Sequence, residues 1–267
     1  MKVNEPPIVS IPRDLYLEER RQLILERLDR QGRVSVAELS KAFGVSEATI
    51  RVDLQALADR QIVVRTHGGA VLASGRLYEL ALATRRLQHV AEKGEIGAAG
   101  AALVVEGDAI FLDSSSTALA VAQRLKQHRR VTVLTNALAV AQELGDATGV
   151  TVVVVGGRLE RDTQSLIGSE GVEALRKFNI QKGFFGAHGI AVPEGLTDIS
   201  ADEADFKRPV VAMCRQVIAV LDSSKWGQVG LASFARIEDI DTILTNDGAP
   251  AGLVTQVQDQ GVNVRLV

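Results

Sequence analysis

The chain has 267 residues, of which 46% are hydrophobic and 24% are charged, and its formal net charge is −3. This length allows two domains, and the hydrophobic share is ample for a packed core in each. The nearly balanced charge excludes the overall basicity that would by itself indicate nucleic-acid binding, so such a function must rest on a local pattern. The single cysteine, Cys214, excludes an intramolecular disulfide, and no Cys/His cluster has the spacing of zinc ligands.

The start of the chain does not look like a targeting segment. Residues 1–12 mix charges with three prolines and lack the basic start and apolar run of a signal peptide. No apolar stretch approaches the roughly 20 residues needed to cross a bilayer. We therefore expect a loose N-terminal arm on a cytoplasmic protein that does not enter a membrane.

Three helices are predicted in the first quarter of the chain. Apolar residues at near-helical spacing predict one helix from Tyr16 to Leu28 and a second from Val36 to Ala42. Gly44 followed by Ser46 breaks this pattern, since a glycine ends helices and a serine caps the next one. The third helix should run from Ser46 to about Arg60.

The third helix is predicted to have one packed face and one free face. Ile50, Leu54 and Leu57 fall at i, i+4 and i+7, which places them on one side. Several polar residues are expected off this apolar face: Thr49, Arg51, Asp53 and Gln55. A face that does not pack is free to bind another molecule.

A β-hairpin is predicted after the third helix. Residues 62–65 and 70–72 are short β-like runs, and the residues between them, Thr66-His67-Gly68-Gly69, are typical of a hairpin turn. Three helices followed by a hairpin predict a winged helix-turn-helix, which we place at residues 13–72. Residues 73–93 read as a charged helical connector to a second domain at residues 94–267.

This arrangement predicts DNA binding. The second helix of a helix-turn-helix pair enters the major groove by its N-terminal residues, and arginine suits the O6/N7 edge of guanine. Arg51 is therefore the main candidate for reading a base, while Arg65 and His67 lie in a wing that has no acidic neighbour between Asp59 and Glu79. The candidate DNA-binding residues are Ser46, Glu47, Thr49, Arg51, Arg65 and His67.

The second domain alternates apolar strands with helical patterns. Its predicted strands are at 109–112, 131–134, 152–155, 183–186, 217–221 and 242–244. Strands with little polar alternation, joined by helices, predict an α/β fold with a mainly parallel sheet buried on both faces. Ligands of such sheets bind at the carboxyl ends of the strands.

Small polar residues gather at these predicted strand ends. Asp113-Ser114-Ser115-Ser116-Thr117 follows one strand and opens a helix, where N–H groups and hydroxyls could hold a phosphate. A set of helix-capping residues is the alternative explanation. Similar groups follow other strands, and two lysines could add positive charge: Thr135, Asn136, Gly156, Gly157, Lys207 and Lys225. Neither a Walker loop nor a GxGxxG fingerprint is present, so we expect no nucleotide cofactor.

Three segments together resemble a known family. VSVAEL at residues 34–39, GVSEATIRVDL at 44–54 and RTHGGA at 65–70 look like the deoxyribose-operon repressor (DeoR) family. The resemblance spans nearly the whole chain. It implies that the second half is similar to the family's sugar-phosphate-sensing domain, with a fold like that of ribose-5-phosphate isomerase and coenzyme A transferases.

The resemblance also implies an effector pocket. The chain departs from the family pattern at two positions. The implied pocket residues are Asp113, Ser114, Ser115, Ser116, Thr117, Thr135, Asn136, Gly156, Gly157 and Lys225. Val52 stands where the family repeats an arginine, which puts one DNA contact in doubt. His188 stands where the family often has an acidic or small polar residue, and it could either bind a sugar hydroxyl or be structural.

These observations predict a cytoplasmic transcription regulator, acting as a homodimer or higher oligomer, that binds double-stranded operator DNA and a phosphorylated sugar. An isomerase that removes a proton from a phosphosugar is the competing class, and Asp198, Asp202 or Glu203 could supply its base. A DNA-bound architectural protein with a vestigial pocket is a third interpretation.

Overall fold

The computed structural model describes residues 17–31, 33–59, 63–66, 68–72 and 82–267. The chain forms two compact units that divide between Gln88 and His89. The predicted arm, the wing residue His67 and residues 73–81 of the predicted connector lie outside the described residues. No helix of the described ranges is long and apolar enough to span a membrane.

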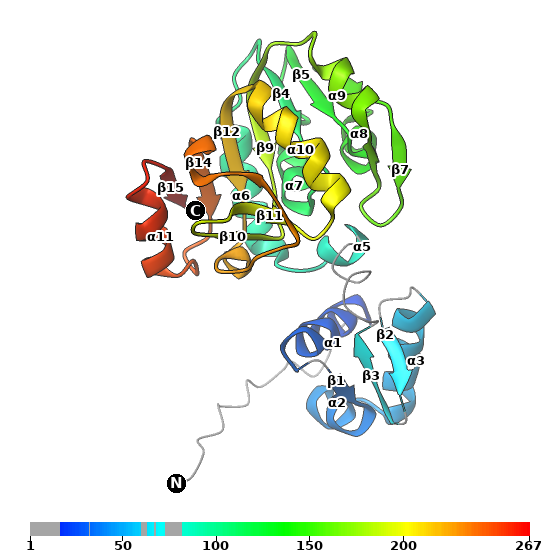
Figure 1. Cartoon of the computed structure of the whole chain (residues 1–267). Helices are drawn as coiled ribbons and strands as arrows, with labels where there is room; N and C mark the ends of the chain where they lie inside the picture. The colour runs from blue at the N-terminus through cyan, green and yellow to red at the C-terminus, as the bar shows by residue number, and fades with distance from the viewer. Residues whose placement is uncertain (1–16, 32, 60–62, 67, 73–81) are drawn as a thin grey trace. The chain divides into compact units, whose positions relative to one another are not determined.

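The N-terminal unit is a helical unit with a small sheet. Its elements are α1 (Leu17–Gln31), β1 (Arg33–Ser35), α2 (Val36–Phe43), α3 (Glu47–Asp59), β2 (Val63–Thr66), β3 (Gly69–Leu72) and the short α5 (Leu82–Arg85). The three strands pair antiparallel in the order β1-β3-β2 (Figure 1). This is a winged helix-turn-helix, with β1 as a strand that we did not predict.

Local signals set the limits of α2 and α3. The Ser35 hydroxyl accepts a hydrogen bond from the Glu38 N–H at 3.1 Å, which caps the start of α2. Gly44 ends that helix at φ 67°, a left-handed conformation that glycine adopts without steric cost. The Ser46 hydroxyl then accepts the Thr49 N–H at 3.1 Å and caps α3.

Asp53 corrects the prediction about the free face of α3. Ile50, Leu54 and Leu57 are buried as expected, but Asp53 is also fully buried. Its carboxylate accepts from Arg20 at 2.6 Å and from Arg21 at 3.1 Å. The expectation that Asp53 lies off the packed face was wrong because it lies three residues after Ile50, on the same side of the helix, where α1 supplies its partners.

The second unit is built on a seven-stranded parallel sheet in the order β15-β14-β12-β9-β4-β5-β6. Its strands are β4 (Ala109–Leu112), β5 (Val131–Thr135), β6 (Val150–Val154), β9 (Ile180–Phe185), β12 (Cys214–Val220), β14 (Thr242–Thr245) and β15 (Asn263–Leu266). Its helices are α6 (Val90–Ala102), α7 (Ser116–Leu125), α8 (Leu138–Leu144), α9 (Ser169–Leu175), α10 (Ala201–Met213) and α11 (Ala251–Gln258). Because α6 begins at Val90, the last residues of the predicted connector belong to this unit.

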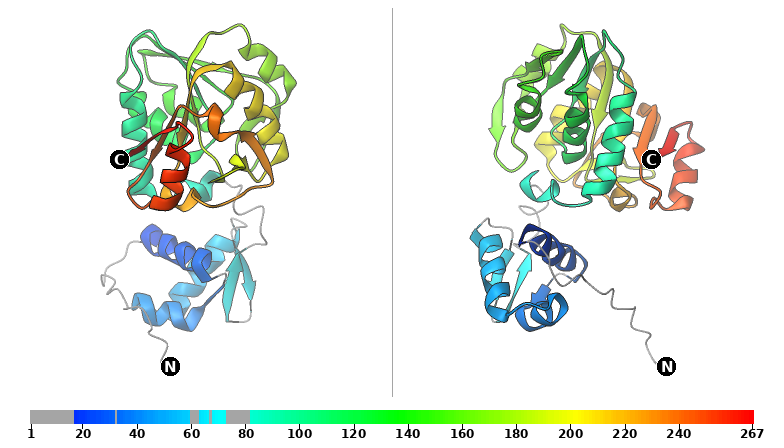
Figure 2. Two further views of the ribbon diagram at one scale, coloured as in Figure 1. Left: turned by 60° about the vertical axis from the view of Figure 1, so that its left-hand side comes forward. Right: turned by 180° about the vertical axis from the view of Figure 1, so that it is seen from behind.

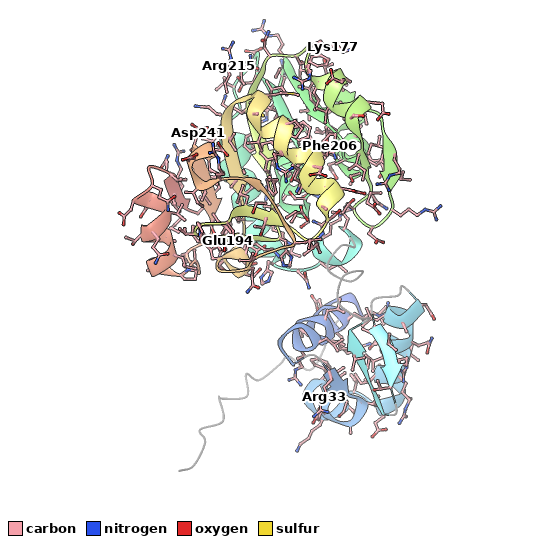
Figure 3. The ribbon with its side chains drawn as sticks, in the orientation of Figure 1. Arg33, Lys177, Glu194, Phe206, Arg215 and Asp241 are labelled. Carbon is pink, nitrogen blue, oxygen red and sulfur yellow. The ribbon has the colours of Figure 1, made fainter. Side chains whose placement is uncertain are left out.

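Helices cover both faces of this sheet. Helices α6, α7 and α8 lie on one face, and α9 and α10 lie on the other (Figure 2). Phe206 of α10 packs against Phe111 of β4 with ring centroids 6.5 Å apart, and Phe111 in turn lies 5.7 Å from Phe185 of β9. Figure 3 shows Phe206 on α10 over the sheet. Burial on both faces explains why the strands are apolar without alternation.

The strand order reverses between β4 and β9. From β4 the chain moves outward through β5 and β6, and it then returns to place β9 on the other side of β4. The chain therefore leaves β4 and β9 toward opposite faces, and open α/β sheets bind ligands at the carboxyl ends of two such strands. We call this position in the sheet the crevice between β4 and β9.

Two smaller β structures were not predicted from the sequence. A hairpin of β7 (Arg158–Glu160) and β8 (Ser165–Ile167) follows β6. A small antiparallel sheet consists of β10 (Gly189–Ala191), β11 (Gly195–Asp198) and β13 (Ala232–Ala235). Two short 3₁₀ turns, Ser223–Lys225 and Ile237–Asp239, complete the unit.

Candidate functional site

One exposed stripe runs along α3. Its members recur at i, i+3, i+4, i+7 and i+11 and are all exposed: Ala48, Arg51, Val52, Gln55 and Asp59. This spacing places them on one face of a helix, opposite the buried face. The stripe is the part of the N-terminal unit best suited to enter a DNA groove.

The predicted DNA-binding residues at the start of α3 already bond to one another. The hydroxyls of Ser46 and Thr49 lie 2.9 Å apart, and the Ser46 hydroxyl also accepts the Thr49 N–H that caps the helix. Arg51 donates to the Glu47 carboxylate at 2.6 Å, and these side chains are 55% and 48% exposed. An exposed i, i+4 ion pair contributes little stability, so Arg51 can exchange it for another acceptor.

Arg65 of the wing strand β2 is half-buried rather than extended into solvent. Its Nη1 donates to the Arg51 carbonyl oxygen at 3.1 Å, which ties the wing to α3. Its Nε is buried and has no hydrogen-bond partner among the described residues. The predicted phosphate contact would have to use the remaining N–H groups of this guanidinium.

In the second unit, Asp113 organises the crevice between β4 and β9. One carboxylate oxygen accepts from the Ser115 N–H at 3.0 Å, and the other accepts from the Gly186 N–H at 3.0 Å. A Cβ on Gly186 would lie 2.4 Å from the Ser115 side chain, so only glycine allows this approach. Asp113 thus fixes the loop after β4 against the end of β9.

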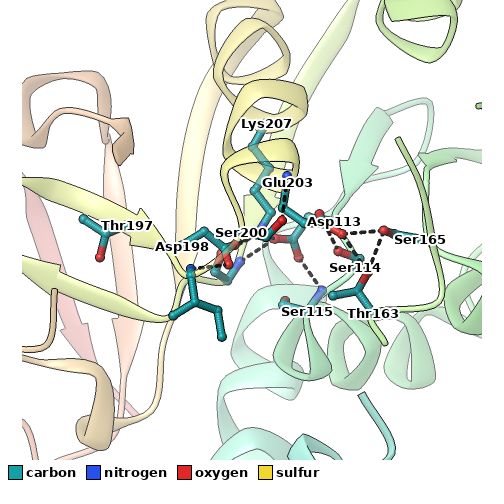
Figure 4. A network of polar contacts seen from close by, with 12 residues as sticks. Asp113, Ser114, Ser115, Thr163, Ser165, Thr197, Asp198, Ser200, Glu203 and Lys207 are labelled. Atoms are coloured by element: carbon teal, nitrogen blue, oxygen red, sulfur yellow. Dashed lines mark hydrogen bonds and ion pairs between the residues drawn. The ribbon is translucent and has the colours of Figure 1, made fainter. Parts of the chain in front are cut away.

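Lys207 completes this arrangement from α10. Its ammonium lies 3.0 Å from the Asp113 carboxylate and 2.9 Å from the Asp198 carboxylate, and it donates to the Gly186 carbonyl at 3.1 Å (Figure 4). Burial opposes its charge, but the two aspartates and Glu203 outweigh burial and raise the pKa of Lys207 above its ordinary value. The predicted positive charge is present, and buried carboxylates already neutralise it.

Glu203 connects the same loop to the β7–β8 hairpin. Its carboxylate accepts from Ser114 at 3.2 Å, from Thr163 at 2.7 Å and from Ser165. The side chain is 1% exposed. Sequence reasoning considered Glu203 only as an isomerase base, and it missed Thr163 and Ser165 because the hairpin that contains them was not predicted.

Ser115, Ser116 and Thr117 form the start of α7. The Ser115 hydroxyl caps the helix by accepting the Ala118 N–H at 3.0 Å. Ser116 and Thr117 occupy the first turn, and both are largely buried. The capping alternative therefore holds for Ser115, while the free N–H groups at the start of this ten-residue helix still face the strand ends.

Asn136 is the most unusual polar residue of the crevice. It follows Thr135, whose register partner Leu112 directly precedes Asp113, so Asn136 and Asp113 lie at the ends of neighbouring strands. The Thr135 hydroxyl donates to the Leu112 carbonyl at 2.7 Å. Asn136 itself is 1% exposed, and neither its amide oxygen nor its amide nitrogen has a hydrogen-bond partner among the described residues.

A second cluster lies one strand farther along, at the end of β12. Asp222 is 1% exposed, and burial would raise the pKa of its carboxyl. The positive charges of Lys225, Lys93 and His89, together with the Ser224 hydroxyl, outweigh burial and lower that pKa instead. Lys93 was not predicted: it is a buried amine on α6, and its position in an ordinary helical pattern gave no signal.

For three predicted site residues, Gly156, Gly157 and His188, the structure gives weaker support for ligand binding. Gly156 and Gly157 are exposed, and a Cβ on Gly157 would lie 2.5 Å from the Ile167 carbonyl, so the approach of β8 already explains that glycine. His188 is half-buried after β9, and its N–H donates to the Thr197 carbonyl at 2.9 Å. Both interpretations of its side chain stay open.

The described residues contain no group of His, Cys, Asp or Glu side chains that could hold a metal ion. Backbone N–H groups, hydroxyls and an amide suit a small polar or anionic ligand.

The comparisons with known proteins agree with this architecture. Residues 20–76 match the DeoR-like helix-turn-helix domain, and residues 88–247 match the DeoR C-terminal sensor domain. A winged helix-turn-helix joined to a sensor domain defines a DNA-binding transcription regulator. The chain belongs to the DeoR family.

Several curated relatives align over almost the full chain. The chain is 34% identical over 248 residues to the HTH-type transcriptional regulator GolR of Listeria innocua, covering 93% of this chain and 98% of that one. It is 33% identical over 233 residues to the HTH-type transcriptional repressor GlcR of Bacillus subtilis, covering 87% and 89%. It is 29% identical over 248 residues to the glycerol-3-phosphate regulon repressor of Escherichia coli, covering 93% and 98%.

Among solved structures, ribose 5-phosphate isomerase A of Methanocaldococcus jannaschii is similar with a TM-score of 0.38 and 16% identity, covering 50% of this chain and 53% of that one. A similarity with this TM-score and identity carries no argument here. The fold of the second unit is defined by its own strand pairing.

Proposed function

We propose that this protein represses a carbohydrate-metabolism operon and that a phosphorylated sugar, bound at the crevice between β4 and β9, changes its affinity for operator DNA. The names of two relatives support repression as the effect on transcription. GlcR is named a repressor, and the Escherichia coli relative is named a glycerol-3-phosphate regulon repressor. The observation that carries the ligand site is Asn136.

Burying an amide without hydrogen bonds is unfavourable, and each unsatisfied group costs about 1–3 kcal/mol. Asn136 has two such groups in a crevice where nearly every other polar side chain is bonded. A sugar hydroxyl can donate to the amide oxygen and accept from the amide nitrogen, which would satisfy both. Asn136 is thus a residue that lacks its partner when no ligand is bound.

The phosphate has a separate place beside Asn136. The loop 113–117 presents backbone N–H groups at the N-terminus of α7, where the helix dipole favours an anion. Lys93 and Lys225 add positive charge near the end of β12. A neutral polar group beside an anion site matches the chemistry of a sugar phosphate.

A thermal-shift panel tests this site. A ligand that binds only the folded state must raise the unfolding midpoint of the protein. We expect one or more pentose or hexose phosphates to do so, while inorganic phosphate and the unphosphorylated sugars do so less. Asn136→Leu is the decisive variant: it should raise the midpoint of the free protein, because the unpaired amide is gone, and abolish the shift that the sugar phosphate causes.

Coupling to DNA is tested by titrating the sugar phosphate with and without operator. Whatever factor the effector imposes on DNA affinity, DNA must impose on effector affinity, and such coupling is typically about 1–3 kcal/mol. Equal effector affinity with and without operator would contradict regulation even if both ligands bind.

We further propose that the site is not catalytic. The three carboxylates considered as an isomerase base already have partners: Asp198 contacts Lys207, Asp202 accepts a hydrogen bond from Arg158 at 2.5 Å, and Glu203 accepts from three hydroxyls. A general base must direct a free lone pair at the proton it removes. Mass-spectrometric detection of aldose–ketose conversion of the bound sugar phosphate would contradict this.

The active state is proposed to be a homodimer or higher oligomer. One α3 stripe offers few polar groups to DNA, and two linked half-sites raise apparent affinity through effective concentration. Light scattering of the full chain tests this, and a strictly monomeric protein that still binds its operator tightly would contradict it.

A further inference from the structure

We propose that Val52 contacts the 5-methyl group of a thymine in the major groove and thereby helps to set the operator sequence. This inference rests on the proposed reading of DNA by α3. It assigns a base-contacting role to an apolar side chain at a position where the sequence suggested only a missing contact.

The exposure of Val52 is the first observation. It is 62% exposed, more than any other exposed large hydrophobic residue of the described ranges. A β-branched residue on an exposed helix face is less favourable than alanine and buries little there. No packing contact among the described residues of the N-terminal unit accounts for a valine at this position.

The neighbours of Val52 on the stripe give the second observation. Arg51 and Gln55 are bonded to acidic residues of their own helix, at 2.6 Å to Glu47 and 2.8 Å to Asp59. These are the side-chain types that read guanine and adenine by paired hydrogen bonds. Val52 lies beside them with the exposed Ala48 one turn before it, so the stripe combines hydrogen-bonding and apolar groups.

The major groove has one apolar group that such a stripe can meet. Among the four bases, only thymine presents a methyl group at the groove edge, and small apolar side chains contact it. Two small apolar residues form too little surface for a stable protein–protein contact. A thymine methyl is therefore the partner that fits Val52 in size and polarity.

The experiment compares thymine with deoxyuridine, which lacks only the methyl group. Full-length protein would first select its binding sites from a library of randomised duplexes, and each thymine of the selected site would then be replaced in turn by deoxyuridine. Binding of wild-type protein, Val52→Ala and Arg51→Ala would be titrated on each duplex. Thermal unfolding of the free variants checks that the exposed substitutions leave the fold intact.

We expect one thymine in each half-site at which deoxyuridine weakens wild-type binding about fourfold, the effect of roughly 0.8 kcal/mol for one buried methyl. Val52→Ala should lose clearly less at that position, because alanine lacks the two methyl groups that bring valine into contact, whereas Arg51→Ala should bind more weakly and still lose about fourfold there. If deoxyuridine at every position affects wild type and Val52→Ala alike, the inference is wrong while DNA reading by α3 stands. If the wild type selects no sequence at all, the proposed function fails together with the inference.

Discussion

The exposed stripe of α3 and the crevice between β4 and β9 use charged groups in opposite ways. On α3, Arg51 is held by an exposed partner four residues away, and that pair is easily exchanged for another acceptor. In the crevice, Lys207 is bonded to Asp113 and Asp198 in a buried network that joins distant parts of the chain. Substitutions on the stripe should therefore alter DNA binding and leave folding intact, while substitutions in the crevice should first alter folding.

The largest effect is expected for Lys207→Met. Removing one member of a buried ion cluster leaves Asp113 and Asp198 uncompensated, which costs about 3–5 kcal/mol. Arg208→Met is the matched control, because Arg208 is the next residue of α10 and its side chain is 53% exposed. Urea unfolding of the two variants measures the difference, and equal losses would contradict the asymmetry between buried and exposed charges.

A smaller loss is expected for Asp53→Ala in the N-terminal unit. The Asp53 carboxylate is fully buried, and the substitution removes its ion pairs with Arg20 and Arg21. These two side chains are 8% and 11% exposed, so their guanidinium groups can turn toward water. We expect about 2–4 kcal/mol of destabilisation. Asp59→Ala, at the exposed end of the same helix, should stay within about 0.5 kcal/mol.

The N-terminal unit also shows which features of the structure could be predicted from the sequence. Helix limits were predictable from nearby signals such as Gly44 and Ser46, since capping acts within one turn. The strand ends were predictable because a buried parallel strand followed by small polar residues is a local pattern. The partners of Asp53 lie more than 30 residues away, so a charge with no local partner was placed on the wrong face.

The crevice shows the same limit. Asp113 and Asn136 were predicted as site residues from their positions after strands. The ion pairs of Lys207 with two aspartates could not be predicted, because they depend on how α10 packs over the sheet. The β7–β8 hairpin has strands of three residues each, too short for a periodic pattern. Thr163 and Ser165 could therefore not be predicted as site residues from the sequence.

On the stripe, Arg51→Ala should weaken specific operator binding by about 1–3 kcal/mol and relax preference at one base pair, with no change in unfolding midpoint. Arg65→Ala should weaken all sequences alike and flatten the salt dependence, because we expect the N–H groups that do not bond to the Arg51 carbonyl to contact backbone phosphates. Titrations on selected and scrambled duplexes at several salt concentrations separate the two effects. A uniform loss for Arg51→Ala would place the recognition surface elsewhere.

The smallest effect concerns pH and the Asp222 cluster. Because the folded protein lowers the pKa of this carboxyl, its ionised form contributes stability above the ordinary pKa of an aspartate, and that contribution is lost as pH falls below about 4 toward the folded pKa. Asp222→Asn keeps an oxygen acceptor for the Ser224 N–H, which Asp222 now accepts at 3.1 Å, but removes the charge. Its stability should therefore fall less steeply than that of the wild type between about pH 5 and pH 3, by under about 1 kcal/mol. Asp247→Asn is the control, since this aspartate is exposed and lies two residues beyond the end of β14. If urea unfolding gives the same pH slope for the wild type and Asp222→Asn, then Lys225 and Lys93 do not stabilise the carboxylate, and the proposed cause of its lowered pKa is wrong.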